Sequence, residues 1–420
     1  MTPFEATAAA AYTGFARRLT ASGLVTDPWV DGNPRFQATP LPLARADHDA
    51  MVRAAEAVAG VLDELGGMVG AEPALLDDFF AMTPAQKLMW QASAPLWHGI
   101  ARADVFLRDG QAPVVCEINC DTPSGLAEAV CLGRLATAEG FADVNADLGA
   151  RFLAVLSRFA DRLSRGGPAE LTVGIVYPTE MTDDLGLVAL YRDWCEQAGH
   201  RVVLGSPYNL QRVAGAVAMF GRRVDVVLRH YKTDWWGERL PLRDDEEPFA
   251  DPDPLTEPLA ALLGAELAGE VAVVNPFGAV LPQNKRAFAF CWERIDRFSP
   301  EAQAVIRSTI PFSLRLESAD RDVLLRERDG WVLKTDYGCE GEEVVIGRDV
   351  SDELWADLLA HAIPQRWIAQ RRFDARRDAA GRAANHGVFI VAGCAAGLYT
   401  RLSVGATDAS AVSVAPVVEA

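Results

Sequence analysis

The feature that most constrains the fold is an alternation of apolar strands with a helical segment between Leu171 and Asn275. The runs "LTVGIVYP", "HRVVLGSP", "VDVVLRHY" and "VAVVNPFG" are short and apolar, and a helical pattern covers 183–198. Strands that alternate with helices are typical of an open α/β unit with a parallel sheet. The sequence therefore predicts such a unit within a mixed α/β (α+β) chain.

The segments on either side of this unit are of a different kind. We expect helices at 5–19, 46–65, 83–94, 126–136, 146–163, 285–298 and 300–309, and a hairpin of strands 103–107 and 113–119 joined through Asp-Gly. We also expect an irregular Pro-rich arm at 27–42, a solvated acidic loop at 242–258, and strands of a second sheet within 331–347, 366–373 and 388–404. Gly-Gly-Pro at 166–168 marks the first boundary, and the predicted domains are 1–165, 166–275 and 276–420.

Charge and composition narrow the class of partner. The 420-residue chain carries a formal net charge of −18 and has no basic block, which argues against nucleic acid and anionic membranes. The sequence has no apolar run of the length that spans a bilayer, and its N-terminus lacks the basic region of a secretory signal. The seven cysteines form no Cys-x-x-Cys pair, which favours reduced thiols in a cytoplasmic protein. We expect small-molecule partners, and the oligomeric state is left open.

The stretch "CEINCDTPSG" at 116–125 ends an apolar strand in polar side chains. If the Asp-Gly turn closes a two- or four-residue loop, residue 104 lies opposite 115, and Asp104, Glu117 and Asn119 share one face. A three-residue loop would reverse the parity. Two carboxylates and an amide with no basic residue nearby in this pattern suit Mg²⁺. The alternative is an exposed polar strand end.

Lysine is scarce in the chain, and its positions point to phosphate contacts. Among 40 basic residues only four are lysines, at 87, 232, 285 and 334. Lys334 ends an apolar strand before Gly338 and Gly341, a pattern that fits either a phosphate-covering flap or an ordinary hairpin. Arg401 lies between apolar neighbours in a strand, so it needs an anionic partner, either a structural carboxylate or a phosphate.

In order and spacing, these motifs resemble the synthetase domain of glutathionylspermidine synthase and its relatives, the circularly permuted ATP-grasp ligases. The resemblance spans about residues 98–403. It is carried by Arg102-x-Asp104, by Glu117-x-Asn119-x-Asp121-Thr122-Pro123 and by Lys232-Thr233-x-x-Trp236. The resemblance implies an ATP-grasp-like fold, with a helical N-terminal region that includes a metal-binding hairpin, a pre-ATP-grasp α/β unit and a nucleotide-binding region. We expect no amidase domain like that of the bifunctional members of the family.

The resemblance also implies the roles of single residues. It implies Mg²⁺ ligation by Asp104, Glu117 and Asn119, a contact of Arg102 to the reacting phosphate or acyl group, and a contact of Arg401 to the γ-phosphate. ATP contacts are implied for Lys285, Lys334, Gly338, Gly341 and Gln370. Substrate contacts are implied for Asp121, Ser124, Asp183, Asp184, Lys232 and Thr233.

The function that follows is ATP- and Mg²⁺-dependent ligation of a carboxylate to an amine through an acyl phosphate. The acid is expected to be a peptide or to resemble an amino acid. Two alternatives stay open at this point: an ATP-binding regulatory protein that does not ligate, and a kinase of a small acid, which needs the same phosphate contacts.

Overall fold

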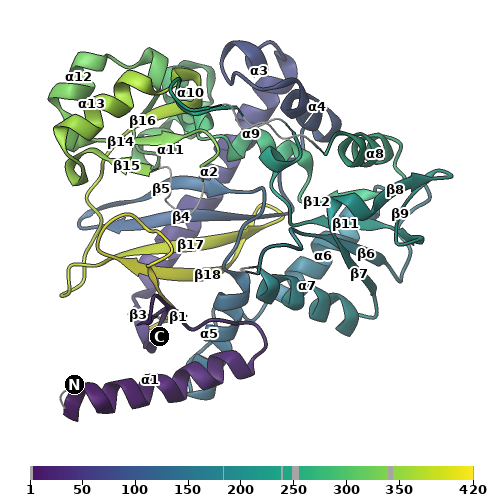
Figure 1. Ribbon diagram of the computed structural model, residues 1–420, viewed down its shortest axis with the longest axis horizontal. Coiled ribbons are helices and arrows are strands. Elements are labelled where there is room, and N and C mark those ends of the chain that lie inside the picture. Colours follow the sequence, from purple (N-terminus) through teal and green to yellow (C-terminus); the bar gives the residue numbers. More distant parts are fainter. Residues whose placement is uncertain (1–2, 183, 238–239, 248–254, 339–343, 420) are drawn as a thin grey trace.

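A six-stranded central sheet forms the middle of the molecule (Figure 1). The computed structural model describes residues 3–182, 184–237, 240–247, 255–338 and 344–419, with side chains from residue 11 onward. The strand order is β3-β19-β18-β17-β4-β5, and every pair is antiparallel except β3–β19. The strands are β3 (Phe36–Leu43), β4 (Ile100–Arg108), β5 (Gln111–Asn119), β17 (Ala383–Val391), β18 (Cys394–Ser403) and β19 (Val412–Val418). Both ends of the chain therefore contribute to one sheet.

Helices cover one face of this sheet and part of the other. The long helix α2 (Arg45–Ala71) buries an apolar stripe against one face, where its side chains pack with Ala103, Val105 and Val115. Helices α5 (Leu126–Ala138) and α6 (Leu148–Ala160) contact β17, β18 and β19 and pack with Phe389 of the opposite face. The remainder of that opposite face carries Asp104 and Glu117.

The predicted open α/β unit is confirmed, and we call it the middle unit. Its sheet has the order β12-β11-β6-β7 with every pair parallel. The elements are β6 (Thr172–Val176), α7 (Leu185–Gln197), β7 (Arg201–Gly205), β11 (Val226–Arg229), α8 (Thr256–Leu267) and β12 (Ala272–Val274). A small antiparallel sheet of β8 (Leu210–Val213), β9 (Ala216–Met219) and β10 (Arg222–Val224) projects from it and was not predicted.

A second antiparallel sheet lies over the central sheet, and we call it, with helices α12 and α13, the lid (Figure 1). Its order is β13-β16-β14-β15. The elements are β13 (Ser313–Arg315), α12 (Arg321–Arg326), β14 (Trp331–Thr335), β15 (Val344–Ile346), α13 (Asp352–His361) and β16 (Trp367–Arg371). Trp331, Trp355 and Trp367 belong to its buried core.

Three predictions about elements were wrong. The run 388–404 does not join the second sheet, because β17 pairs with β4 of the central sheet. The arm at 27–42 is not wholly irregular: its end forms β3, where Pro40 and Pro42 are tolerated because β3 is an edge strand. The helix predicted at 285–298 ends at Glu293. The remaining elements are α1 (Pro3–Ala21), β1 (Trp29–Val30), β2 (Asn33–Pro34), α3 (Leu75–Asp78), α4 (Pro84–Ser93), α9 (Val280–Gln283), α10 (Arg286–Glu293) and α11 (Pro300–Thr309).

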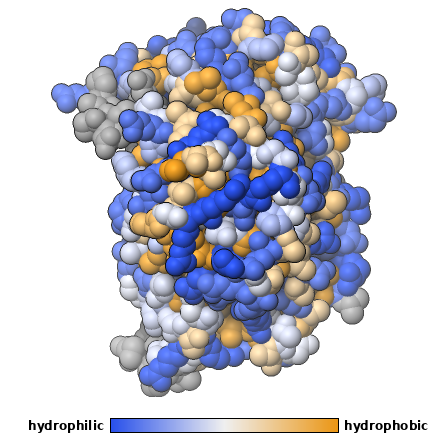
Figure 2. Space-filling model, turned by 90° about the vertical axis from the view of Figure 1, so that its right-hand side faces the viewer, coloured by the Kyte–Doolittle hydropathy of each residue, from blue (hydrophilic) through white to orange (hydrophobic). Residues whose placement is uncertain are grey.

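The surface around the middle unit is mainly hydrophilic. Figure 2 shows one face, on which hydrophobic side chains are scattered among hydrophilic ones. Over the part of the chain that the structure describes, no helix combines the length and apolarity needed to cross a bilayer.

Candidate functional site

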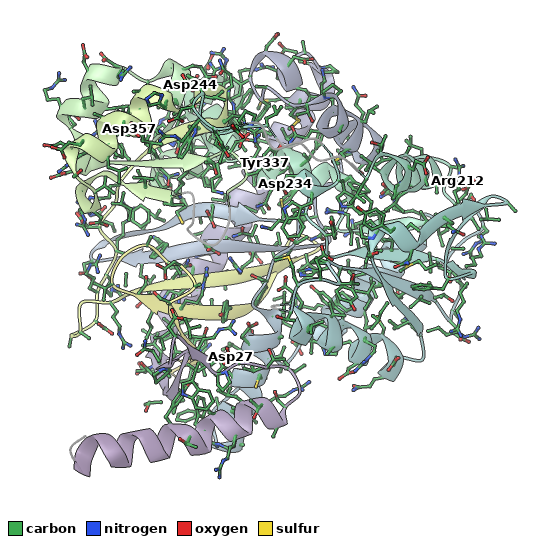
Figure 3. The ribbon with its side chains drawn as sticks, in the orientation of Figure 1. Asp27, Arg212, Asp234, Asp244, Tyr337 and Asp357 are labelled. Carbon is green, nitrogen blue, oxygen red and sulfur yellow. The ribbon has the colours of Figure 1, made fainter. Side chains whose placement is uncertain are left out.

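A deep cleft separates the lid from the central sheet. Its floor comes from β4, β5, β17 and β18, and its roof comes from β14, β15 and β16. At one end it is closed by residues of the middle unit, among them Asp184, Lys232 and Asp234. Figure 3 labels Asp234 and Tyr337, which both line this cleft. Substrates that reach the floor are therefore enclosed by three parts of the fold.

The hairpin β4–β5 brings the predicted metal ligands together on the floor. Asp104 pairs with Glu117, and Arg102 pairs with Asn119. The predicted pairing of residue 104 with 115 was wrong, because two irregularities in the ladder shift the register although the turn at Asp109 and Gly110 has two residues. Each shift adds one residue to β5, so together they restore the parity, and the prediction of a shared face is confirmed.

The Asp104 carboxylate lies between two guanidinium groups. Arg102 Nε donates to Asp104 Oδ1 at 2.8 Å, and Arg401 Nη2 lies 3.1 Å from Oδ2. Burial raises the pKa of Asp104, but the charges of Arg102 and Arg401 lower it more, and the result is about 2. The expectation of a carboxylate pair without a basic partner was therefore wrong, since Arg102, two residues away on the same strand face, is that partner.

Glu117 contacts another predicted metal ligand, Asn119, and lies near a lysine. Its Oε1 accepts from Asn119 Nδ2 at 3.2 Å, and its Oε2 lies 3.8 Å from Lys285 Nζ. Lys285 Nζ also donates to the Gly338 carbonyl at 2.5 Å. Lys334 Nζ donates to the Cys116 carbonyl at 3.3 Å and lines the roof side of the cleft. Both lysines are buried, Lys285 near the Glu117 carboxylate and Lys334 against the backbone of β5.

The other nucleotide-side predictions are placed only in part. Gln370 is buried in the roof, and its Nε2 donates to Ser313 Oγ at 3.0 Å. Gly341 lies outside the described residues, so the flap is described only to Gly338. Apolar side chains line the same region, where the ring centres of Phe106 and Phe373 are 5.3 Å apart. No motif in the sequence singled out these two phenylalanines.

On the substrate side, Asp121 lines the cleft and contacts Thr233. Asp121 forms an ion pair with Arg229 at 2.5 Å, and its Oδ2 accepts from the Thr233 backbone N–H at 2.7 Å and hydroxyl at 3.1 Å. The Ser124 carbonyl accepts from Arg102 Nη1 at 2.8 Å. These contacts link the end of β5 to the middle unit.

The two remaining substrate-side predictions that the structure describes are Asp184 and Lys232. Asp184 Oδ2 lies 2.9 Å from His230 Nε2, and Lys232 Nζ lies 5.0 Å from the centre of the Trp235 ring. Burial raises the pKa of Asp184, but the hydrogen bond and charge of His230 lower it, with a net shift below the usual range. Asp183 lies outside the described residues.

Two residues that sequence reasoning missed shape the floor from β17. Asn385 Nδ2 donates to Asp104 Oδ2 at 3.0 Å, and Gly387 pairs with Asp104 in the sheet. A Cβ atom at Gly387 would lie 2.6 Å from Arg102 Cδ, so only glycine leaves room for the guanidinium. No local pattern could have found these residues, because their role depends on long-range strand pairing.

The donor set on the floor fits a hard divalent cation beside phosphate. Carboxylate and amide oxygens of Asp104, Glu117 and Asn119 are the ligands that Mg²⁺ takes, and it completes its shell with water and phosphate oxygens. Beside them, Asn385 Oδ1 is buried without a hydrogen-bond partner, as expected of an oxygen poised for a water or cation. Lys285 and Lys334 supply point charges of the kind that contact phosphates.

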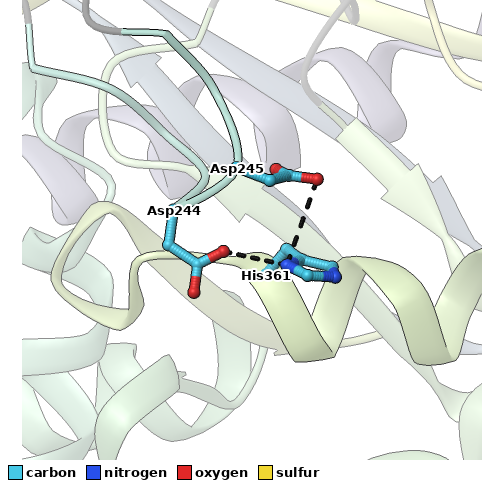
Figure 4. A group of neighbouring side chains, drawn as sticks. All are labelled: Asp244, Asp245 and His361. Carbon is cyan, nitrogen blue, oxygen red and sulfur yellow. Dashed lines mark hydrogen bonds and ion pairs between the residues drawn. The ribbon is translucent and has the colours of Figure 1, made fainter.

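Another group of metal-ligating side chains lies outside the cleft (Figure 4). Asp244 and Asp245 surround His361 at the end of α13, with His361 Nδ1 2.8 Å from Asp244 Oδ1. Arg243 pairs with Asp245 at 2.8 Å and with Asp357 at 2.9 Å. Arg243 and, when protonated, His361 offset part of the charge of Asp244, Asp245 and Asp357, so the group is an exposed ion-pair network between the lid and the 240–247 segment.

Comparison with known proteins identifies the family of the chain and shows similar folds. A family model described as glutathionylspermidine synthase preATP-grasp matches residues 53–418. A glutathione synthetase-like effector from Globodera pallida, in its apo form, superposes with a TM-score of 0.59 at 12% identity, over 96% of this chain and 95% of that chain. A protein of Methylobacillus flagellatus assigned as a gamma-glutamylcysteine synthetase gives a TM-score of 0.44 at 13% identity, over 81% and 83%. No curated protein matches the sequence.

Proposed function

Since the chain belongs to the glutathionylspermidine synthase pre-ATP-grasp family, we propose that it is an ATP- and Mg²⁺-dependent carboxylate–amine ligase. The family and the fold make it an ATP-grasp protein of the ligase type. The single observation that supports the finer proposal is the cleft, which is lined by the oxygen-bearing side chains of Asp104, Glu117 and Asn119 and by Lys334, Arg102 and Arg401, with Lys285 3.8 Å from Glu117. The acid proposed is a peptide or an amino-acid-like molecule.

The phosphate chemistry is assigned to the floor and the roof. Asp104, Glu117 and Asn119 would hold Mg²⁺, which when bound neutralises phosphate charge. Lys285 and Lys334 would bind the ATP phosphates, with Gly338, Gly341 and Gln370 at the nucleotide. Arg102 and Arg401 would stabilise the charge on the transferring phosphoryl group, since fixed cations in an enclosed site favour the transition state most.

The bond changes are those of acyl activation. A carboxylate oxygen of the acid attacks the γ-phosphorus of ATP, and the bond between the γ-phosphorus and the oxygen bridging to the β-phosphate breaks. The products of this step are ADP and an acyl phosphate. The amine nitrogen then attacks the acyl carbon, the carbon–oxygen bond breaks, and phosphate leaves as the nitrogen loses a proton. Contacts to the acid and amine are proposed for Asp121, Ser124, Asp183, Asp184, Lys232 and Thr233.

A phosphate-release assay tests this proposal against its two alternatives. Purified protein with ATP and Mg²⁺ is given a panel of amino acids and short peptides, each with and without a panel of amines. A ligase releases phosphate when both an acid and an amine are present. Equal phosphate release with and without amines, for every acid that supports turnover, contradicts ligation. ADP and a phosphorylated acid without free phosphate identify a kinase, and no turnover with any pair favours the regulatory alternative.

A further inference from the structure

One glutamine joins the two segments that carry the metal ligands and the first phosphate lysine. Gln283 is the last residue of α9, two positions before Lys285. Its Oε1 accepts from the backbone N–H of Cys120 at 2.8 Å and from that of Asp121 at 3.1 Å. The side chain is half-buried and lines the cleft.

The two N–H groups that Gln283 accepts from lie just past the end of a strand. β5 is an edge strand, and its pairing with β4 ends at Asn119. The next two N–H groups therefore have no partner in the sheet, and buried backbone donors left without partners are costly. One side-chain oxygen satisfies both, which sets the direction of the chain as it leaves Asn119.

The other polar groups of Asp121 are also taken up. Its carbonyl accepts from Asn275 Nδ2 at 3.1 Å, and its carboxylate is held by Arg229 and Thr233. Gln283 differs from these partners because it comes from the segment that continues to Lys285. Its two hydrogen bonds therefore join the end of β5 to the segment that carries Lys285.

We infer that Gln283 is a positioning residue for the proposed phosphoryl transfer, holding Glu117 and Asn119 at a set distance from Lys285. This inference rests on the proposed function. The reacting phosphate must meet the metal on one side and Lys285 on the other, and a misplacement of about 1 Å in such a site costs on the order of 100-fold in rate. The Glu117–Lys285 separation of 3.8 Å is the distance that Gln283 maintains.

Two substitutions of Gln283 distinguish the effect of its hydrogen-bond acceptor from the effect of its side-chain size. Gln283→Met keeps the length and removes the acceptor, whereas Gln283→Glu keeps an acceptor oxygen. The readouts are Mn²⁺ binding by electron paramagnetic resonance with a non-hydrolysable ATP analogue, and the Mg²⁺ dependence of phosphate release. We expect Gln283→Met to weaken Mn²⁺ binding about 10-fold and to lower kcat about 100-fold, and we expect Gln283→Glu to restore most of both.

Cys120→Ala is the matched control. It removes the long contact of Cys120 Sγ to the Ala279 carbonyl, at 3.6 Å, between the same two segments, and keeps both backbone hydrogen bonds to Gln283. We expect it to lower the melting temperature while Mn²⁺ binding and Mg²⁺ dependence stay within about threefold of wild type.

The outcomes distinguish this inference from the proposed function. Wild-type metal binding and turnover in Gln283→Met, or equal impairment of the Met and Glu variants, overturns the positioning role. If Gln283→Met does not fold, Gln283→Glu alone decides, because a folded Glu variant with impaired metal binding contradicts the role. If the wild-type protein itself binds no Mn²⁺ with the ATP analogue, the proposed function fails first.

Discussion

At the scale of single residues, the cleft balances its own charges. Asp104 is paired with Arg102 and Arg401, and Glu117 lies near Lys285. Buried charges need such partners, because an unpaired one costs several kcal/mol. Arg102, Arg401 and Lys285 can bind phosphates only if Asp104 and Glu117 are paired with another cation instead. The pairing therefore fits a site in which a metal and a nucleotide arrive together.

Glu117→Gln tests the metal site directly. The substitution keeps the size of the side chain and removes one anionic ligand, so Mg²⁺-dependent phosphate release is expected to fall by about 100-fold or more. The free energy of unfolding is expected to change by less than about 1 kcal/mol, since Glu117 is only half-buried. Steady-state kinetics and urea unfolding check the two expectations.

The control for this prediction is Glu139→Gln, which removes an exposed carboxylate paired with Arg18 at 3.1 Å. It is expected to leave both rate and stability unchanged. Full phosphate release by Glu117→Gln would remove Glu117 from the metal site.

The sequence predicted the residues of the floor better than their contacts. Alternation along two strands predicted that Asp104, Glu117 and Asn119 share one face, and this holds because two register shifts of one residue each compensate. The register shifts were not predictable because the strand patterns show no irregularity, and the environment of Asn385 and the acceptor role of Gln283 were not predictable because each depends on residues far apart in the chain. Short-range patterns report side-chain direction, whereas contacts depend on tertiary packing.

At the scale of elements, the 242–244 segment pairs with the end of the lid helix α13. The Asp244 N–H donates to the His361 carbonyl at 2.8 Å, and the Ile363 N–H donates to the Leu242 carbonyl at 3.0 Å. His361 also hydrogen-bonds the Asp244 side chain, which raises its pKa. The contact between α13 and this segment therefore includes one group whose charge responds to pH.

We expect His361→Gln to destabilise the protein at low pH more than at high pH. Because the folded-state pKa of His361 is raised, its contribution is fully present below the unfolded-state pKa of about 6.5 and is lost as pH rises through the folded value. The charged groups that face it are Asp244, Asp245 and Asp357, with Arg243 between them.

The measurement is the difference in melting temperature between wild type and His361→Gln from pH 5.5 to pH 9. The difference is expected to be largest at the acidic end and to shrink as pH rises. A difference that stays constant over this range would show that the charge on His361 contributes nothing.

The element predictions succeeded where the pattern is local. The parallel sheet of the middle unit follows from four apolar runs, because buried strands of this kind have a plain signature. The membership of β17 and β18 in the central sheet did not follow, since nothing within 388–404 says which of two sheets its strands will join. Local sequence predicts that a strand exists, and its partner is decided by the rest of the chain.

At the scale of the whole molecule, the cleft is assembled from segments far apart in the chain. The metal hairpin at 100–119 comes before the roof strand with Lys334, and Arg401 comes after it. We propose that this order is a circular permutation of the ATP-grasp arrangement. The division into domains 1–165, 166–275 and 276–420 also stays a prediction. The strands of the central sheet come from the first and the last of these predicted domains.

The most direct test of the central claim follows the oxygen atoms. An acid that supports turnover is labelled with ¹⁸O in its carboxylate and incubated with ATP, Mg²⁺ and an amine, and the released phosphate is analysed by mass spectrometry. Activation through an acyl phosphate leaves one carboxylate oxygen on the phosphate, so we expect one ¹⁸O in each phosphate released and an amide product. Unlabelled phosphate formed together with amide would contradict the proposed mechanism.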